Sequence, residues 1–431
     1  MTNASKRRVV VTGLGVVAPN GVGLDAFEKA LREGRSGIRF QEAMKDRGFS
    51  CNVAGVPEGV DELRKGYFSE EELVAMNSGM TFAGMAAVDA FRDAGLPLPK
   101  WDQDILHEDT GAIVGTGIGG LETFADKVYP AVQAGKVRRL GSSMVEQIMA
   151  SSVSAKLSGL LALGNQVTTN SSACSTGTEA LIMGAQRIQA GLASRMVVGG
   201  AEGASHYIWA GFDAMKVLSS KFNDRPTEAS RPLSASACGF VPASGAGILV
   251  IEDLDTALQR GARIYAEVLG SSLNSGGMRF GGSMTAPSGY SVQRAIRTAI
   301  LAAGIRPDQI NYVNGHLTAT MADPKEVGNW SAALEVPAER FPYFNSTKSM
   351  IGHALGAAGG IECVATVLQL ARGFVHPSLN SEDFHEDLKP FERAVPRRAL
   401  TVDLDIAAKA SFGFGDVNSC VIFKKWREHH V

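Results

Sequence analysis

Short apolar runs alternate with helix-like segments along the whole chain, and this alternation limits which folds the chain can adopt. The expected strands are 9–12, 111–115, 195–200, 246–251, 263–269, 310–314 and 419–423. The expected helices are 25–32, 70–91, 179–190, 254–260, 292–303 and 359–371. Alternating strands and helices are typical of α/β proteins. We therefore expect two related α/β halves, 1–255 and 256–431, that pack together rather than form independent domains.

The composition narrows the classes of protein that remain. At 431 residues, 45% hydrophobic and with 49 glycines, the chain has room for a large globular core with many tight turns. A net charge of −2 gives no support for a nucleic-acid partner. Five scattered cysteines form no disulfide framework, which favours a reducing, cytoplasmic setting.

No part of the sequence predicts a membrane span. The chain has no stretch of 18 apolar residues. The apolar run near the start is short, is interrupted by Gly13 and Gly15, and lacks a cleavage site of the signal-peptide kind. We interpret it as a first buried strand followed by a glycine turn.

Cys174 has the surroundings of a nucleophile. It stands among small residues in the run SSACSTG, directly before the helix expected at 179–190. The positive end of a helix dipole favours a thiolate, and small neighbours let a carbonyl approach the sulfur. Backbone N–H groups of such a turn can also form an oxyanion hole. The other four cysteines are interpreted as structural.

Two glycine patterns match the dinucleotide-binding fingerprint. Gly13, Gly15 and Ala18 fit G-x-G-x-x-A, and the run GTGIGG at 115–120 fits G-x-G-x-x-G. The first leads into Pro-Asn-Gly rather than a helix, and the second lacks the acidic residue expected about 20 positions later. We interpret both as chance matches in a glycine-rich chain.

Two histidines and one lysine lie in segments suited to chemistry. His316 follows the strand expected at 310–314, and His353 lies in the run KSMIGHALGAAGG, five residues after Lys348. The small residues of that run allow close helix packing beside a polar group. The spacing of one cysteine and two histidines fits no usual metal site, so we expect none.

Four motifs in order resemble the type I/II β-ketoacyl-acyl-carrier-protein synthases, which are thiolase-fold condensing enzymes. They are the Cys174 turn, the His316 strand end, KSMIGHALGAAG and SFGFGDVN, and the similarity begins at VVVTGLGVVAPNG. The resemblance covers nearly the whole chain. It implies a homodimer of thiolase-like, five-layered α-β-α-β-α subunits that act on acyl carrier protein.

The resemblance implies a catalytic role for each of these residues. Cys174 would carry the acyl chain as a thioester, and His316 and His353 would bind the malonyl thioester and stabilise its enolate. Lys348 would tune the electrostatics of the histidines, with Glu326 as the acid that pairs with it. The backbone N–H groups of Cys174 and Phe414 would form the oxyanion hole.

Further positions match substrate-binding residues of the family. Thr318 and Thr320 would hydrogen-bond the phosphopantetheine arm, Ile118 and Phe412 would line the acyl site, and Phe414 would act as its gate. Phosphopantetheine is carried on the acyl carrier protein, so the resemblance implies no resident cofactor. A basic run at 136–139, Lys-Val-Arg-Arg, could meet an acidic carrier protein.

Several positions depart from the family pattern. The family has H-G-T-[GS]-T at the first histidine, whereas this chain has Leu317 in place of the glycine, which predicts either φ below zero or backbone strain there. Asp416 and Val417 replace the usual glycine-threonine after Phe414. These departures favour a specialised paralogue over the general elongation enzyme.

Three other functions fit the sequence less well. A non-elongating partner subunit, similar to a chain-length factor, would usually lack the cysteine, so Cys174 speaks against it. A thiolase would carry a second catalytic cysteine in a glycine-rich loop near the C-terminus, whereas Cys420 lies in an apolar run. Nothing in the chain resembles a Cys-His hydrolase signature.

Overall fold

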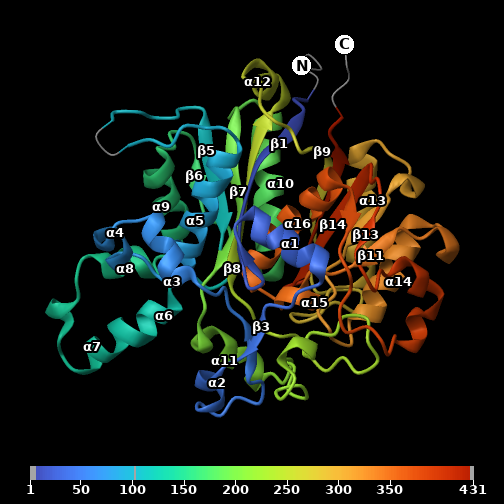
Figure 1. Ribbon diagram of the computed structural model, residues 1–431, viewed down its shortest axis with the longest axis horizontal. Helices are drawn as coiled ribbons and strands as arrows, with labels where there is room; N and C mark the ends of the chain where they lie inside the picture. The colour runs from blue at the N-terminus through green and yellow to red at the C-terminus, as the bar shows by residue number, and fades with distance from the viewer. Residues whose placement is uncertain (1–5, 101–102, 428–431) are drawn as a thin grey trace.

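The computed structural model describes residues 6–100 and 103–427, and its centre is an 11-stranded sheet built from two halves (Figure 1). In the N-terminal half the strand order is β1 (Val9–Ala18), β8 (Gly245–Asp253), β7 (Arg195–Glu202), β5 (Thr110–Gly115) and β6 (Val167–Thr168). In the C-terminal half it is β9 (Ala266–Ser275), β15 (Val417–Lys425), β14 (Ile406–Gly413), β10 (Tyr312–Asn314) and β11 (Tyr343–Asn345). The short β2 (Gly21–Val22) pairs with β1.

The two halves repeat one topology. In the N-terminal half, β1 pairs antiparallel with β8 and β8 pairs antiparallel with β7, whereas the β7–β5 and β5–β6 pairings are parallel. In the C-terminal half, β9 pairs antiparallel with β15 and β15 pairs antiparallel with β14, whereas the β14–β10 and β10–β11 pairings are parallel. The halves meet where β1 pairs with β9 at Val10 and Glu267. The alternation in the sequence therefore reflects two structural repeats, and the exact boundary at residue 255 stays a prediction.

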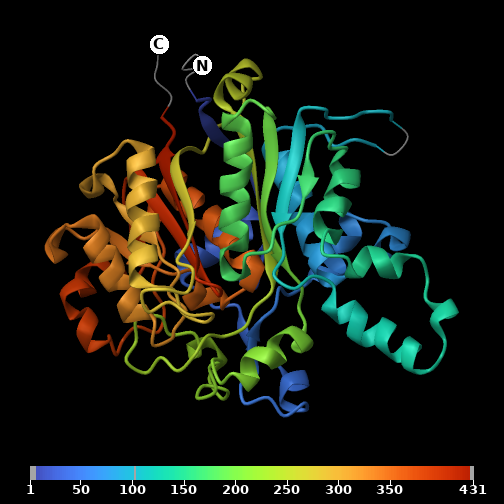
Figure 2. The ribbon, with the colours of Figure 1, turned by 180° about the vertical axis from the view of Figure 1, so that it is seen from behind.

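Helices cover both half-sheets and also separate them. α5 (Ser78–Asp93) packs on β1 and β8, with α9 (Ser152–Leu161) beside it. α10 (Thr176–Gln189) and α16 (Ala358–Arg372) lie between the half-sheets and contact strands of both. α13 (Gly289–Ala303) covers β9 and β15, and α14 (Asp323–Leu334) packs on α13. This is the five-layered α-β-α-β-α arrangement that the resemblance implied, with α10 (green) along the middle of Figure 2.

The shorter elements join these layers at their ends. The helices are α1 (Leu24–Glu33), α2 (Glu42–Lys45), α3 (Val60–Leu63), α4 (Glu70–Val74), α11 (His206–Ala214), α12 (Leu254–Gln259) and α15 (Lys348–Ile351). Two small two-stranded antiparallel sheets pair β3 (Ile38–Phe40) with β4 (Val53–Gly55), and β12 (Phe374–Val375) with β13 (Leu400–Thr401).

Small residues allow the middle layer to pack closely. From Ala358 to Leu370, every residue of α16 is buried. A Cβ on Gly177 of α10 would overlap the backbone at Gly360 of α16, and a Cβ on Gly247 of β8 would overlap the backbone at Ile361. The glycine-alanine run after His353 therefore serves close helix packing, as the sequence predicted.

The structure corrects several expected elements. The strand expected at 9–12 continues through Gly13 and Gly15 to Ala18, because the bare glycines let α5 lie directly on β1. The helix expected at 70–91 is interrupted before Asn77, whose side chain accepts from the Met80 N–H and caps α5. β14 and α14 were not predicted.

Residues 116–150 project from the N-terminal half as an arm (Figures 1 and 2). The arm contains α6 (Leu121–Thr123), a π-helical turn (Phe124–Val128), α7 (Tyr129–Gln133), a 3₁₀ turn (Val137–Arg139) and α8 (Ser143–Ile148). Its exposed apolar side chains are Ile118, Phe124, Tyr129, Val132, Val137 and Val145. Among the described helices, none is long and apolar enough to span a membrane.

Candidate active site

Cys174 lies in a 3₁₀ turn (Ala173–Ser175) that leads directly into α10. The Thr176 hydroxyl accepts from the Ser172 N–H at 2.8 Å and donates to the Ala173 carbonyl at 2.7 Å, which fixes the turn. The Ser175 hydroxyl reaches the carbonyls of Ser411 and Val417 in the other half at 3.1 and 3.0 Å. The nucleophile turn is therefore built where the two halves join.

The His353 ring contacts the sulfur of Cys174. Its Nε2 lies 3.1 Å from Sγ, and its Nδ1 accepts the Leu355 N–H at 3.3 Å. An imidazole that accepts at Nδ1 carries its proton on Nε2, so we assign an Nε2–H that points at the sulfur. The His353 N–H also donates to the Val241 carbonyl at 2.7 Å, which fixes the backbone of the histidine.

His316 completes the cluster. Its ring centroid lies 5.4 Å from that of His353 at an interplanar angle of 84°. The Cys174 sulfur and one ring nitrogen each of His316 and His353 all lie within 4.8 Å of one another. Within residues 6–100 and 103–427, nothing hydrogen-bonds the buried His316 Nδ1. The structure thus brings together the three residues selected from the sequence, although 142 and 37 positions separate them along the chain (316 − 174 and 353 − 316).

Burial determines the charge state of all three groups. It raises the pKa of the Cys174 thiol to about 11, against lowering contributions from Lys348 and from a hydrogen bond with the Phe414 backbone. It lowers the pKa of both histidines well below the usual value, and the charge of Lys348 adds to this effect. The resting site holds a neutral thiol and neutral imidazoles, so the helix dipole does not by itself produce the thiolate that the sequence suggested.

Lys348 pairs with a carboxylate that the sequence analysis missed. Its Nζ forms a buried ion pair with Glu362 of α16, and Nζ of Lys409 lies 2.9 Å from the other Glu362 oxygen. The expectation that Glu326 pairs with Lys348 is therefore wrong. The signal that could have found Glu362 is a lone carboxylate inside the otherwise apolar run AAGGIECVATVLQL.

Glu326 instead holds the backbone of the His316 loop. Its carboxylate accepts the N–H groups of His316 and Leu317 at 2.6 and 2.8 Å. Asp323 accepts those of Thr318 and Ala319 at 2.9 and 3.1 Å. Burial raises the pKa of Glu326 to about 7 and that of Asp323 to about 6.

The His316 loop also shows where the departure from the family pattern is accommodated. Leu317 is fully buried and is not among the residues with positive φ, whereas Ala319 has φ +61°. The left-handed residue of this loop is therefore Ala319 rather than Leu317. The hydroxyls of Thr318 and Thr320 lie 3.0 Å apart and are partly exposed, beside a cavity of about 70 Å³ that Thr320 helps to line.

Aromatic rings surround the cluster. The Phe412 ring lies 6.2 Å from that of His316, and the Phe414 ring lies 6.2 Å from that of Phe212. The Phe240 ring lies 5.2 Å from that of His353 and was missed in the sequence, where it stands in a loop without any motif. The Phe412 ring thus lies beside His316, whereas the Phe414 ring lies beside Phe212.

The loop after β5 is held by a second missed carboxylate. Fully buried Glu202 accepts the N–H groups of Gly117 and Gly356 at 2.8 and 2.9 Å, and that of Ile118 at 3.3 Å. The backbone donors that would cradle a dinucleotide phosphate in GTGIGG are therefore occupied. Ile118 itself is 47% exposed in the single chain.

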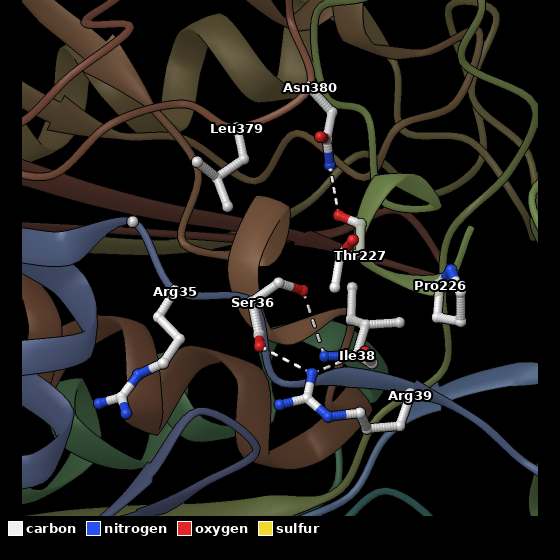
Figure 3. Close-up of a pocket in the computed structure, with 9 residues that line it drawn as sticks. Arg35, Ser36, Ile38, Arg39, Pro226, Thr227, Leu379 and Asn380 are labelled. Atoms are coloured by element: carbon white, nitrogen blue, oxygen red, sulfur yellow. Dashed lines mark hydrogen bonds between the residues drawn. The ribbon is translucent and has the colours of Figure 1, made fainter.

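A cavity of about 600 Å³ lies outside this cluster (Figure 3). Its lining residues are Gly34, Arg35, Ser36, Ile38, Arg39, Pro226, Thr227, Leu379 and Asn380. The guanidinium of Arg39 is turned back onto the carbonyls of Ser36 and Ile38. None of the predicted site residues lines this cavity, so the sequence and the geometry both place the chemistry at Cys174.

Comparison with known proteins agrees with this geometry. The family model for the β-ketoacyl synthase N-terminal domain matches residues 6–257, and the one for the C-terminal domain matches residues 265–382. The chain is 37% identical over 428 residues to 3-oxoacyl-(acyl-carrier-protein) synthase 2 of Vibrio harveyi, covering 98% of this chain and 100% of that protein. It is 34% identical over 424 residues to 3-oxoacyl-(acyl-carrier-protein) synthase 1 of Escherichia coli (strain K12), covering 98% of this chain and 100% of that protein.

Solved structures show the same fold over nearly the whole chain. The ishigamide ketosynthase/chain length factor superposes with a TM-score of 0.88 at 29% identity, covering 98% of this chain and 100% of that one. A type II polyketide ketosynthase, solved in complex with its acyl-carrier protein, superposes with a TM-score of 0.87 at 29% sequence identity, again covering 98% of this chain and 100% of that one. The two domain matches and the full-length relatives show that the chain belongs to the β-ketoacyl synthase family.

Proposed function

We propose that this chain is a β-ketoacyl-acyl-carrier-protein synthase, which joins an acyl group held on Cys174 to a malonyl group with loss of carbon dioxide. The observation that carries the proposal is the contact of 3.1 Å between Cys174 Sγ and His353 Nε2, with His316 beside it and a helix N-terminus behind it. This set offers one nucleophile and two neutral N–H donors, which suits thioester exchange followed by enolate formation.

The first step is acyl transfer. The sulfur of Cys174 attacks the carbonyl carbon of the incoming thioester, the bond from that carbon to the carrier sulfur breaks, and the thiol proton passes to the departing sulfur. The N–H groups of Cys174 and Phe414 stabilise the charge on the carbonyl oxygen in the transition state. His353 donates toward the sulfur, so it stabilises the attacking thiolate rather than removing the proton.

The second step is decarboxylation and condensation. The malonyl thioester oxygen binds the N–H groups of His316 and His353, whose lowered pKa values keep them neutral. The bond to the carboxylate breaks, carbon dioxide leaves, and the electron pair becomes an enolate. Its carbon attacks the acyl carbonyl, the bond from that carbonyl to Cys174 breaks, and the sulfur leaves as a thiolate that takes a proton from water.

The remaining roles belong to the same proposal. Thr318 and Thr320 hydrogen-bond the phosphopantetheine arm, and the acyl chain extends past Phe412 toward Ile118. The pair of threonine hydroxyls, 3.0 Å apart and reachable from solvent, supports the first role. Because the acyl groups arrive on phosphopantetheine, the reaction as proposed requires no resident cofactor or metal. Metal analysis of the purified protein tests that, since the cysteine and the two histidines also form a compact set of metal donors.

We also propose the partners. The carrier protein is acidic and meets the exposed basic residues Lys136, Arg138 and Arg139. A second copy of the chain covers exposed apolar side chains of the arm away from residues 136–139, including Ile118. All five cysteines are free thiols, which supports a cytoplasmic setting. Light scattering in solution tests the homodimer directly.

The experiment compares the wild-type protein with Cys174→Ala. Each protein is incubated first with an acyl-carrier protein and then with malonyl-carrier protein, and intact mass and carbon dioxide release are followed. The wild type is expected to gain one acyl group on the peptide that contains Cys174 and then to release carbon dioxide with formation of a 3-ketoacyl product. Cys174→Ala should gain no acyl group.

Each alternative outcome has its own reading. Acylation without condensation would contradict the roles assigned to His316 and His353. A folded wild-type protein that is not acylated by carrier-bound chains of any tested length would overturn the proposal and favour a non-elongating partner subunit. A catalytic ketosynthase homologue added to the assay would then be expected to gain activity.

A further inference from the structure

Asp416 joins a surface segment to the loop that carries Phe414. Phe414, Gly415 and Asp416 form the three-residue turn between β14 and β15, in which Gly415 and Asp416 have φ of +88° and +58°. Asp416 is fully buried. A buried carboxylate in a left-handed conformation is costly, so its contacts must compensate for both the conformation and the charge.

The contacts of Asp416 reach across residues 276–291. One carboxylate oxygen accepts from the Ser291 hydroxyl at 2.9 Å and the Ser288 N–H at 3.1 Å, and the other accepts the Met278 N–H at 3.2 Å. The Asp416 carbonyl accepts the Gly276 N–H at 2.9 Å. Within the described part of the chain, no lysine or arginine forms an ion pair with this carboxylate.

The shape of the segment fits around the carboxylate. A Cβ on Gly276 or Gly282 would overlap the side chain of Asp416. The Gly415 N–H also donates to the Met284 carbonyl at 2.8 Å. The segment 276–291 and the turn 414–416 are therefore tied together at five points, four of which involve Asp416.

The same turn is held against the nucleophile. Gly413 lies so close to the chain at Cys174 that a Cβ would stand 3.2 Å from the Cys174 nitrogen. The next residue is Phe414, whose backbone N–H lowers the pKa of the Cys174 thiol. The conformation of the turn determines whether that N–H points at the sulfur and at the oxygen of a bound thioester. Asp416 stands only two residues further along the same turn.

We propose that Asp416 is a positioning residue for the reaction: by tying the turn to the segment 276–291, its carboxylate holds the Phe414 N–H in place at Cys174. The inference rests on the proposed function for its kinetic consequence, whereas the contact with Cys174 is independent of it. The chain has Asp416 where its family usually has glycine, so this tie is a feature of the chain itself.

The test uses Asp416→Gly and Asp416→Asn, with Thr285→Ala as a control. Glycine and asparagine both tolerate φ +58°, so neither change strains the turn. Glycine removes every carboxylate contact, whereas asparagine keeps one acceptor oxygen and places an NH₂ group where the Met278 N–H donates. Thr285 lies exposed in the same segment, and its side chain makes no contact with Asp416.

The decisive readout is the pH dependence of Cys174 alkylation by iodoacetamide, followed by peptide mass. Looser packing that admitted water to the sulfur would lower the thiol pKa and move the curve to lower pH, because burial is the main cause of the raised pKa. The other groups that act on this thiol are Lys348, Glu362 and Glu202, with His316 and His353 in the same cluster, and all are unchanged in the variants. A displaced Phe414 N–H moves the curve of Asp416→Gly to higher pH.

Condensation kinetics provide the second readout. Losing an oxyanion-hole donor outright costs a factor of 10²–10³, so a donor that is only loosened should lower kcat about tenfold in Asp416→Gly, with KM for the acyl substrate changed much less. The kcat of Asp416→Asn should lie between that of Asp416→Gly and that of the wild type, and the kcat of Thr285→Ala should equal that of the wild type.

A purely structural role for Asp416 would give a different pattern. Asp416→Gly would then melt at a lower temperature, its alkylation curve would stay in place or move to lower pH, its kcat at a temperature where it is folded would equal that of the wild type, and the proposal would be overturned. If the wild type itself fails to condense, the proposed function fails, and the alkylation curves still decide whether Asp416 positions the Phe414 N–H.

Discussion

At Cys174, burial and hydrogen bonding act on the same thiol in opposite directions. Burial raises its pKa to about 11, whereas the Phe414 backbone and the charge of Lys348 lower it. The sequence placed the cysteine before a helix and so suggested a thiolate. It could not show how the turn is anchored in the other half, because that anchoring depends on Ser411 and Val417, more than 200 positions away, whose carbonyls accept from the neighbouring Ser175 hydroxyl.

The raised pKa predicts how Cys174 reacts with pH. The thiolate fraction of a group with pKa about 11 rises about tenfold per pH unit below that value, so alkylation by iodoacetamide should increase about 100-fold from pH 7 to pH 9. A Cys238→Ser background removes the half-buried second thiol. A rate that levels off below pH 8 would show that the thiolate is already formed and would contradict this account.

At the scale of single elements, the His316 loop shows what motif comparison can and cannot predict. The motif correctly led to His316, Thr318 and Thr320 as neighbours in one loop. It also led to Leu317 as the strained position, because the family has glycine there. The structure places the left-handed residue at Ala319, and Leu317 instead fills the core of the C-terminal half. Backbone φ at one position depends on the whole loop, which one residue type does not determine.

Two glycine substitutions separate these interpretations. Leu317→Gly removes a fully buried side chain and should lower the free energy of unfolding by roughly 4 kcal/mol. Ala319→Gly loses one buried methyl group, worth about 0.8 kcal/mol, but relieves about 1 kcal/mol of left-handed strain, so it should stay within about 1 kcal/mol of the wild type. Urea unfolding measures both, and the reverse order would place the strain at Leu317.

Helix α16 carries one charged residue, Glu362, in its buried interior, and two lysines compete for it. Glu362→Gln leaves Lys348 and Lys409 facing each other without a carboxylate and should cost about 3–5 kcal/mol. Lys348→Met keeps the Glu362–Lys409 pair and fills the volume of the lysine stem, so its cost should be smaller, roughly 2 kcal/mol. Chemical unfolding measures the loss of unfolding free energy in each of the two variants. Equal costs would mean that Lys409 does not pair with Glu362.

At the scale of the whole molecule, the sequence predicted two α/β halves, and the structure shows the same strand order in both. The pattern of strands and helices suffices for this, because each half repeats it. The strand β14 escaped prediction because its run IAAKASFG is rich in alanine and weak in β-branched residues. The site could be located from four motifs, whereas its supporting carboxylates stand in none of them, and Glu362 is marked in the sequence only by its place in an apolar run.

The shared middle layer predicts that the halves unfold together. α10 and α16 each contact strands of both half-sheets, so neither half can keep its core without the other. Far-UV circular dichroism, tryptophan fluorescence and loss of Cys174 protection should therefore give one coincident urea transition. Two separated transitions, or a cooperatively folded fragment 1–255, would show that the halves are independent domains.

The central claim is that carbon–carbon bond formation depends on an acylated Cys174. The most direct measurement is the mass of the carrier-bound product after acylated protein, freed of excess acyl donor, is mixed with malonyl-carrier protein. We predict one 3-ketoacyl product per acylated Cys174, and none with His316→Ala or His353→Ala proteins that are still acylated. An acylated wild-type protein that keeps its acyl group and yields no such product would contradict the account.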